Sequence, residues 1–151
     1  MKVYLASPFF NEREKRIYNF VIRSIRKQEG IDLFVPQEHT IPNAWDLPNH
    51  LWAESVFAVD LLALQQCDVV VVINYGMYSD SGTAWECGYA YATGKKIINV
   101  LVDTHTNEEN CYSLMMLNGG HYSVPLRYFG VTPLSDILEH KMTYVKHCEQ
   151  K

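Results

Sequence analysis

The hydrophobic residues of this chain fall into short apolar segments that alternate with longer amphipathic ones. Five short segments are predicted as strands, at residues 2–6, 31–35, 68–74, 96–102 and 121–124. The third contains Val69–Ile73, an unbroken run of branched apolar side chains that is typical of a strand buried on both faces. Helices are predicted between and after the strands, at residues 11–29, 51–66, 83–93, 111–117 and 135–147.

Because strands and helices alternate, the pattern indicates an α/β fold with one parallel sheet that carries helices on both faces. We expect the whole chain, residues 1–151, to form a single domain. Such sheets bind ligands beyond the carboxyl ends of their strands. That rule brings residues 4–10, 74–86 and 103–110 around one site. The loop at 36–49 follows the second strand, and a loop of this length is usually functional or mobile.

The composition is that of an ordinary globular protein and narrows the class of function. Hydrophobic residues make up 48% and charged residues 20%, with a net charge of −4. These values disfavour disorder and the binding of a nucleic-acid polymer. The longest apolar run is too short for a membrane span, and the N-terminus lacks the apolar region of a signal peptide. The four cysteines show no Cys-x-x-Cys spacing, so we expect free thiols in a cytoplasmic protein.

Several well-known ligand motifs are missing. No glycine-rich dinucleotide fingerprint and no phosphate-binding loop of the GxxxxGK[S/T] type occurs. The six histidines form no H-x-x-x-H pair and no pair with cysteine at metal-ligand spacing. We therefore expect no metal site.

The densest chemical signal is the segment from Asp80 to Glu86, which places two carboxylates around the start of a predicted helix. Gly82 lets the backbone approach a ligand closely, and an ionised, partly desolvated carboxylate is a competent nucleophile. A second interpretation stays open. Thr83 and Glu86 also fit a capping box, in which Glu86 only bonds to the backbone of Thr83, and Asp80 fits a turn residue.

Further candidates come from their positions on predicted elements. Tyr4 alternates with its apolar neighbours on the first strand, so it points to the opposite face and could orient a carboxylate at the sheet edge. Asp60 lies on the apolar side of a predicted helix, which favours partial burial. Ser7 and Ser113 could donate hydrogen bonds at the site, although serines at such positions are more often helix caps. A core tyrosine and an exposed helical acid remain the alternatives for Tyr4 and Asp60.

Taken together, these segments resemble the nucleoside 2-deoxyribosyltransferase family over residues 1–118. The resemblance rests on the order and spacing of five pieces: Val-Tyr-Leu-Ala-Ser-Pro-Phe-Phe at 3–10, Asp-Leu-Leu at 60–62 with Cys-Asp at 67–68, Asp-Ser-Gly-Thr-Ala-Trp-Glu-Cys-Gly at 80–88, Gly-Lys at 94–95, and Ser-Leu-Met at 113–115.

The resemblance implies a flavodoxin-like three-layer sandwich with five parallel strands in the order 2-1-3-4-5. It implies that Glu86 attacks the anomeric carbon of a 2′-deoxynucleoside and forms a deoxyribosyl ester. A second base then attacks this ester from the vacated face, with net retention. Tyr4 would hold the Glu86 carboxylate, while Asp60 and Asp80 would face the base and the sugar, one of them moving the base proton. The resemblance implies no metal and no organic cofactor.

One position departs from the family pattern. Family transferases usually carry Asn at the position of Ser113, and that Asn comes from a neighbouring subunit to bind the sugar 5′-hydroxyl. The related 2′-deoxynucleoside 5′-monophosphate N-hydrolases release free base and deoxyribose 5-phosphate, and they hold the phosphate with serines. They are therefore the alternative. The first loop, residues 6–10, favours the transferase, because it lacks the arginine that the hydrolases place there.

The implied partners are 2′-deoxynucleosides, free purine and pyrimidine bases, and further copies of the chain. The family is oligomeric, commonly a hexamer built from dimers, with sites completed across an interface. The substrate-binding candidates are Ser7, Gln37, Gly82, Ser113 and Met115, with Glu38 as a further contact at the ligand edge. Three aromatic residues in loops fit either an interface or base stacking, namely Trp45, Tyr75 and Tyr78.

Overall fold

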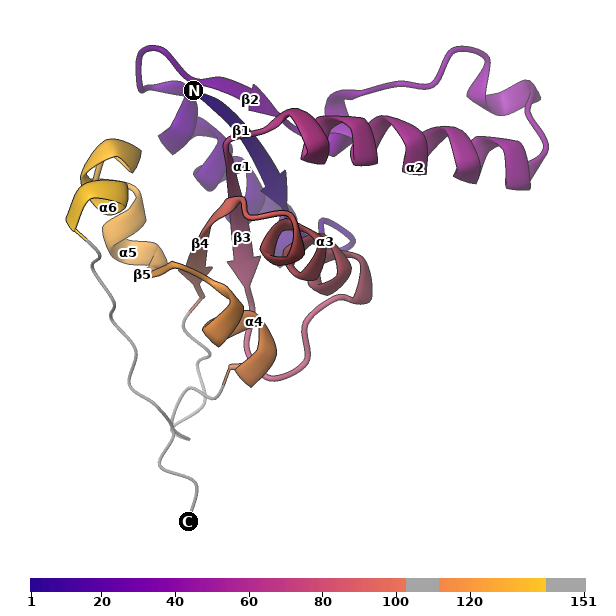
Figure 1. Ribbon diagram of the computed structural model, residues 1–151. Coiled ribbons are helices and arrows are strands. Elements are labelled where there is room, and N and C mark those ends of the chain that lie inside the picture. The colour runs from indigo at the N-terminus through magenta and orange to yellow at the C-terminus, as the bar shows by residue number, and fades with distance from the viewer. Residues whose placement is uncertain (103–111, 141–151) are drawn as a thin grey trace.

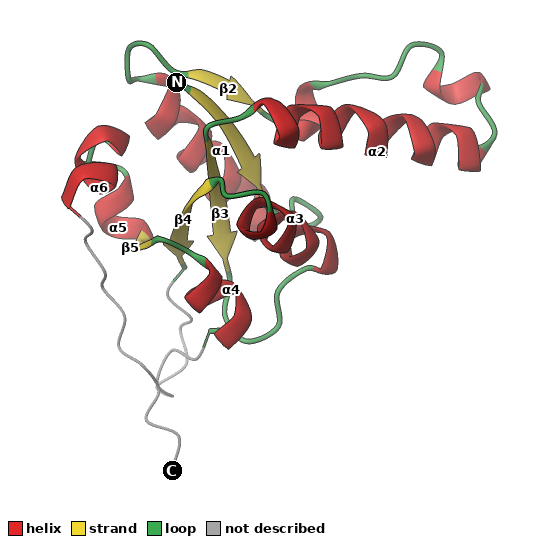
Figure 2. Cartoon of the chain, in the orientation of Figure 1, coloured by secondary structure: helices red, strands yellow, loops and turns green. Residues whose placement is uncertain are grey.

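One parallel sheet of five strands organises the molecule, and Figures 1 and 2 show helices packed around it. The structure is a computed structural model, and it describes residues 1–102 and 112–140. The strand order is β2-β1-β3-β4-β5, so the expected order 2-1-3-4-5 is confirmed. All four neighbouring pairs are parallel. The strands are β1 (Lys2–Ala6), β2 (Asp32–Phe34), β3 (Val69–Asn74), β4 (Lys96–Leu101) and β5 (Tyr122–Pro125).

Helices connect the strands and differ from the predicted ones mainly at their ends. They are α1 (Glu12–Arg26), α2 (Asn49–Gln66), α3 (Ser81–Ala92), α4 (Leu114–Gly119), α5 (Leu126–Phe129) and α6 (Leu134–His140), with two 3₁₀ turns, η1 (Pro36–Glu38) and η2 (Ala44–Asp46). The predicted helix at 111–117 starts three residues late, at Leu114. The structure describes the C-terminal helix only as far as His140. The sequence did not predict α5, η1 or η2, because segments of three or four residues are too short to show a periodic pattern.

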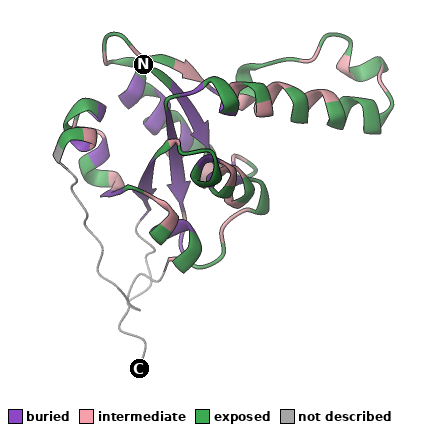
Figure 3. Ribbon diagram, viewed as in Figure 1, coloured by how far each residue is buried: buried purple, intermediate pink, exposed green. Residues whose placement is uncertain are grey.

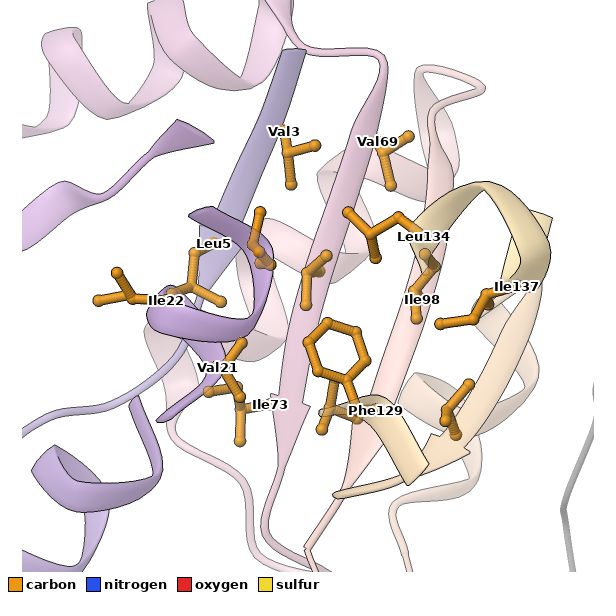
Figure 4. Packing of buried hydrophobic residues seen from close by; sticks show 14 of the residues in the cluster. Val3, Leu5, Val21, Ile22, Val69, Ile73, Ile98, Phe129, Leu134 and Ile137 are labelled. Carbon is orange, nitrogen blue, oxygen red and sulfur yellow. The ribbon is translucent and has the colours of Figure 1, made fainter. Parts of the chain in front are cut away.

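Residues on β1 alternate between the two faces of the sheet, as the sequence predicted. Val3 and Leu5 belong to the larger hydrophobic core, which α1, α5 and α6 cover. Figure 4 shows this core, where Phe129 of α5 and Leu134 of α6 pack over the strands. Tyr4 and Ala6 point to the other face, which α2, α3 and α4 cover through residues such as Leu64 and Cys87. The sheet is therefore covered on both faces, which confirms the three-layer arrangement.

Helix α2 extends beyond the body of the molecule, and the segment that carries η1 and η2 runs beside it (Figure 1). Leu64 is the only buried residue of this 18-residue helix, and Figure 3 shows most of its length as exposed. Its exposed side chains include large apolar ones, namely Leu51, Trp52, Phe57 and Leu62. An exposed apolar surface of this extent is typical of a contact with another molecule. Among the described residues, no helix combines the length and apolar character needed to cross a membrane.

Candidate active site

A pocket of about 780 Å³ opens at the carboxyl end of β1, where the sequence analysis expected the site. Its walls come from four places: the loop after β1, the segment from η1 to η2, one side of α2, and the first turns of α3. The volume lies in the range of small-molecule sites. The residues that line it are Ser7, Phe9, Phe10, Pro36, Gln37, His39, Thr40, Ile41, Asn43, Ala44, Trp45, Asp46, Trp52, Val56, Asp60, Asp80, Gly82, Thr83 and Glu86.

Glu86 faces this pocket and pairs with a tyrosine from the strand beneath it. The Tyr4 hydroxyl donates a hydrogen bond to Glu86 Oε1 over 2.6 Å, and Tyr4 is fully buried. The capping-box interpretation is therefore wrong. The N-cap of α3 is Asp80 rather than Thr83, so Glu86 lies in the second turn, too far along the helix to bond to the cap backbone.

The pKa of Glu86 is raised to about 7, first by burial and also by the nearby charges of Asp60 and Asp80, while the Tyr4 hydrogen bond opposes this rise. The pKa of the Tyr4 hydroxyl is also raised, first by its burial and then by the Glu86 charge. Tyr4 therefore stays protonated and acts as a permanent donor to the carboxylate. A carboxylate with this pKa is ionised in a large share of molecules at neutral pH and carries little of the hydration that would blunt it as a nucleophile.

Asp80 has a structural role as well as a place in the pocket wall. Its Oδ2 accepts hydrogen bonds from the Thr83 backbone N–H at 2.8 Å and from Thr83 Oγ1 at 3.0 Å. Asp80, which the sequence analysis had considered as a turn residue, is thus the N-cap of α3, and the same side chain lines the pocket. A Cβ at Gly82 would lie 3.2 Å from this oxygen, so glycine fits the close approach there.

Asp60 reaches the pocket from α2 and is half-buried, as its position among apolar neighbours predicted. Burial raises the pKa of its carboxyl group, and the nearby His39 opposes this rise. Unlike Asp80, Asp60 accepts no hydrogen bond from the residues that the structure describes. Its carboxyl group can therefore form a hydrogen bond with a molecule in the pocket.

The remaining substrate-binding candidates divide into two groups. Ser7 and Gln37 line the pocket together with Gly82, and the Ser7 hydroxyl donates to Pro8 O. Ser113 and Met115 are not among the lining residues. Ser113 is the N-cap of α4 without a side-chain cap bond, and Met115 is 85% exposed. The structure of one chain thus does not bring these two residues to its own pocket.

Several pocket residues were missed by the sequence analysis. The aromatic side chains of Phe9, Phe10 and Trp52 line the pocket, as does His39. Trp45, which was singled out for an interface or stacking, also lines it and is fully exposed. A signal existed in the density of aromatic residues in the first loop and around the start of α2. These aromatic residues follow no helical or strand spacing, so the sequence could not show that their side chains meet at one pocket.

Other expectations fall outside the pocket. Glu38 does not line it and instead forms an ion pair with Arg26. Tyr75 is half-buried and Tyr78 is exposed, and neither lines the pocket. Cys67 and Cys87 are buried free thiols, as expected. The described residues contain no cluster of side chains suited to a metal ion. The predicted site segment 103–110, and the cysteines at 111 and 148, lie outside the described residues.

The fold and pocket together define a flavodoxin-like α/β protein with an acidic pocket at the carboxyl end of its sheet. A family model described as nucleoside 2-deoxyribosyltransferase matches residues 3–120. The chain belongs to this family.

Individual relatives agree with this assignment. A nucleoside deoxyribosyltransferase of Lactobacillus leichmannii is 24% identical over 110 residues, which cover 67% of this chain and 70% of the relative. A solved 2-deoxyribosyltransferase from Bacillus psychrosaccharolyticus is similar with a TM-score of 0.78 and 27% identity, over 96% of this chain and all of that one (100%). A CMP N-glycosidase from Clostridium botulinum shares the fold, with a TM-score of 0.54, 20% identity and coverage of 83% and 88% of the two chains.

Proposed function

We propose that the protein is a nucleoside 2-deoxyribosyltransferase that exchanges the base of 2′-deoxynucleosides through a covalent intermediate on Glu86. The observation that carries the proposal is the pair of Glu86 and Tyr4 at the pocket, with a carboxylate that is partly desolvated and held by one buried hydroxyl. Names of relatives at 24% and 27% identity support the same reaction class.

In the first half-reaction, a Glu86 carboxylate oxygen attacks C1′ of the deoxyribose, and the bond from C1′ to the base nitrogen breaks. The electron pair of that bond stays on the base, which takes a proton from Asp60. We assign the proton to Asp60 rather than Asp80, because burial raises the pKa of Asp60 while Asp80 is engaged as the cap of α3. In the second half, the acceptor base returns a proton to Asp60 and its nitrogen attacks C1′, which releases the Glu86 carboxylate.

The charge of the pocket favours a nucleoside over a nucleotide. Four of the described residues that line it are acidic, namely Asp46, Asp60, Asp80 and Glu86, and none of the described lining residues is a lysine or arginine. A 5′-phosphate would enter with about two negative charges and no cation in this wall to pair with, which is unfavourable in a partly desolvated site. This argument weighs against the alternative of a 5′-monophosphate N-hydrolase, which Ser113 had left open.

We further propose that the protein works as a homo-oligomer in which α4 of one copy completes the site of another. Ser113 and Met115 lie outside the pocket of their own chain, and Met115 is exposed. The exposed apolar side chains of α2 supply a surface for such an association. Light scattering measures the mass in solution, and a monomer at micromolar concentration would contradict this part of the proposal.

The test of the reaction is base exchange followed by chromatography. The protein is mixed with deoxythymidine or deoxyinosine and a free purine, and formation of a new deoxynucleoside is expected. The matched control replaces the nucleoside with its 5′-monophosphate, which should react more slowly. No new nucleoside from any donor would refute the transferase, and faster cleavage of the monophosphate without an acceptor base would favour the hydrolase.

A further inference from the structure

Part of the pocket wall is formed by the segment directly after β2. Gln37 and His39 both line the pocket, whereas Glu38 between them does not. The segment is a single turn, closed by a hydrogen bond from the His39 backbone N–H to Pro36 O at 3.2 Å. A turn this short has few internal contacts, so its position depends on what holds it from outside.

Arg26 at the end of α1 holds this turn from the side away from the pocket. Its Nη1 donates to Glu38 Oε1 at 2.9 Å, and its Nη2 donates to Glu38 Oε2. The contact is therefore bidentate, which fixes direction as well as distance. The hydrogen bonds with Arg26 also lower the pKa of Glu38, so the pair stays charged at neutral pH. Arg26 itself does not line the pocket.

The same turn is connected to the nucleophile through a stack of rings. The His39 ring lies on Phe34 with centroids 4.0 Å apart and an angle of 11°. Phe34 in turn lies on Tyr4 at 5.3 Å and 11°, and Tyr4 donates to Glu86. A continuous series of contacts thus connects the turn to the Glu86 carboxylate, and Arg26 contacts the turn at the end of this series.

We propose that Arg26 is a positioning residue for base binding: through Glu38 it fixes the turn that presents Gln37 and His39 to the base of the substrate. The inference rests on the proposed function. The amide of Gln37 both donates and accepts hydrogen bonds, so it can read the edge of a purine or pyrimidine only if its place is fixed. Without the anchor, the turn must be ordered each time a base binds, which weakens binding and leaves the chemical step unchanged.

The test compares R26Q with R26K and with the control K15Q. Lys15 is also on α1 and also forms an exposed ion pair, with Glu12 at 3.0 Å, but that pair stays within the helix. We expect R26Q to raise KM for the base about threefold to fivefold, as for a partly exposed pair, with kcat within about twofold. R26K, which keeps the charge but loses the bidentate contact, should give an intermediate KM. K15Q should match the wild type.

A second readout does not depend on activity. Hydrogen exchange of the backbone amides at 37–39 should be faster in R26Q than in K15Q or the wild type. An R26Q variant with the KM and exchange rates of K15Q would overturn the inference, and so would a fall in kcat as large as the rise in KM. These outcomes are distinct from failure of the proposed function, which would show as no base exchange by the wild type itself.

Discussion

Replacing Tyr4 with Phe removes one hydroxyl and tests the electrostatic core of the site. Tyr4 donates to Glu86 Oε1 at 2.6 Å and is fully buried, and this hydrogen bond holds the pKa of Glu86 down, at about 7. A hydrogen bond to a charged group contributes about 1.5–3 kcal/mol, and one pKa unit corresponds to about 1.4 kcal/mol. The substitution should therefore raise the pKa of Glu86 by about one to two units, to ~8–9.

The direction of the pH effect follows from the role of the carboxylate. In the proposed mechanism Glu86 must be ionised to attack C1′, so kcat/KM of the wild type should rise with pH through about 7. In Tyr4→Phe this ascending limb should move to ~8–9, so that the variant loses about 10- to 100-fold at pH 6 and less as the pH rises toward 8. The assay is the pH profile of base exchange.

Tyr18→Phe is the matched control, because Tyr18 is equally buried but lies on the opposite face of the sheet and makes no hydrogen bond to Glu86. Its profile should coincide with that of the wild type. If the acidic limb of Tyr4→Phe stays at the wild-type position, the hydroxyl does not set the ionisation of the nucleophile and the reasoning fails.

Five further substitutions, at four positions, give separate outcomes. Glu86→Gln should abolish base exchange. Because the pKa of Glu86 is raised in the folded state from 4.5 to about 7, its charge destabilises the fold above pH 4.5. The free energy of unfolding of the variant, measured in urea, should therefore be higher by up to ~3 kcal/mol at pH 8 and unchanged at pH 4. Equal gains at both pH values would contradict this. Asp60→Asn should lower kcat by about 100-fold or more with a small change in KM; a normal kcat would remove Asp60 from proton transfer. Asp80→Ala should lower the free energy of unfolding by about 1 kcal/mol through loss of the α3 cap, whereas Asp80→Asn should keep that stability and shift the acidic limb to lower pH, since the Asp80 charge raises the pKa of Glu86. Gly120→Ala should destabilise the fold by about 1–3 kcal/mol, because its Cβ would lie 2.0 Å from Asn99 Nδ2; an unchanged melting temperature would speak against the packing described there.

The direction of the side chains on the sheet could be predicted from the sequence pattern, whereas the strand order was predicted only through the resemblance to the family. Strict alternation on β1 placed Tyr4 opposite Val3 and Leu5, and the structure confirms that placement. Apolar neighbours on α2 predicted the partial burial of Asp60. These predictions succeeded because periodicity reports which face of an element is buried.

The start of α3 shows where local patterns become ambiguous. Asp80 and Thr83 are both good N-cap residues, and the choice of Asp80 moves Glu86 one turn deeper into the helix. With Thr83 as the N-cap, Glu86 would bond to the cap backbone, whereas with Asp80 as the N-cap, Glu86 faces the pocket. Only the contact with Tyr4, 82 positions away in the sequence, resolves it.

The shape of the wall from η1 to η2 could not be predicted, although its loop was expected to be functional or mobile and Gln37 was expected to bind substrate. Its residues form no regular element of more than three residues, so no repeat points His39 or Trp45 toward the carboxylates. Its position depends on contacts distant in sequence, such as the ion pair between Arg26 and Glu38 and the stack of His39 on Phe34.

The most direct test of the central claim is mass spectrometry after the protein is mixed with a 2′-fluoro-2′-deoxynucleoside. The electron-withdrawing fluorine slows breakdown of the glycosyl ester, so the intermediate should accumulate. The account predicts a sugar adduct on the peptide that contains Glu86, and none in the Glu86→Gln variant. Base exchange without any adduct, or an adduct on a different side chain, would contradict the assignment of Glu86 as the nucleophile.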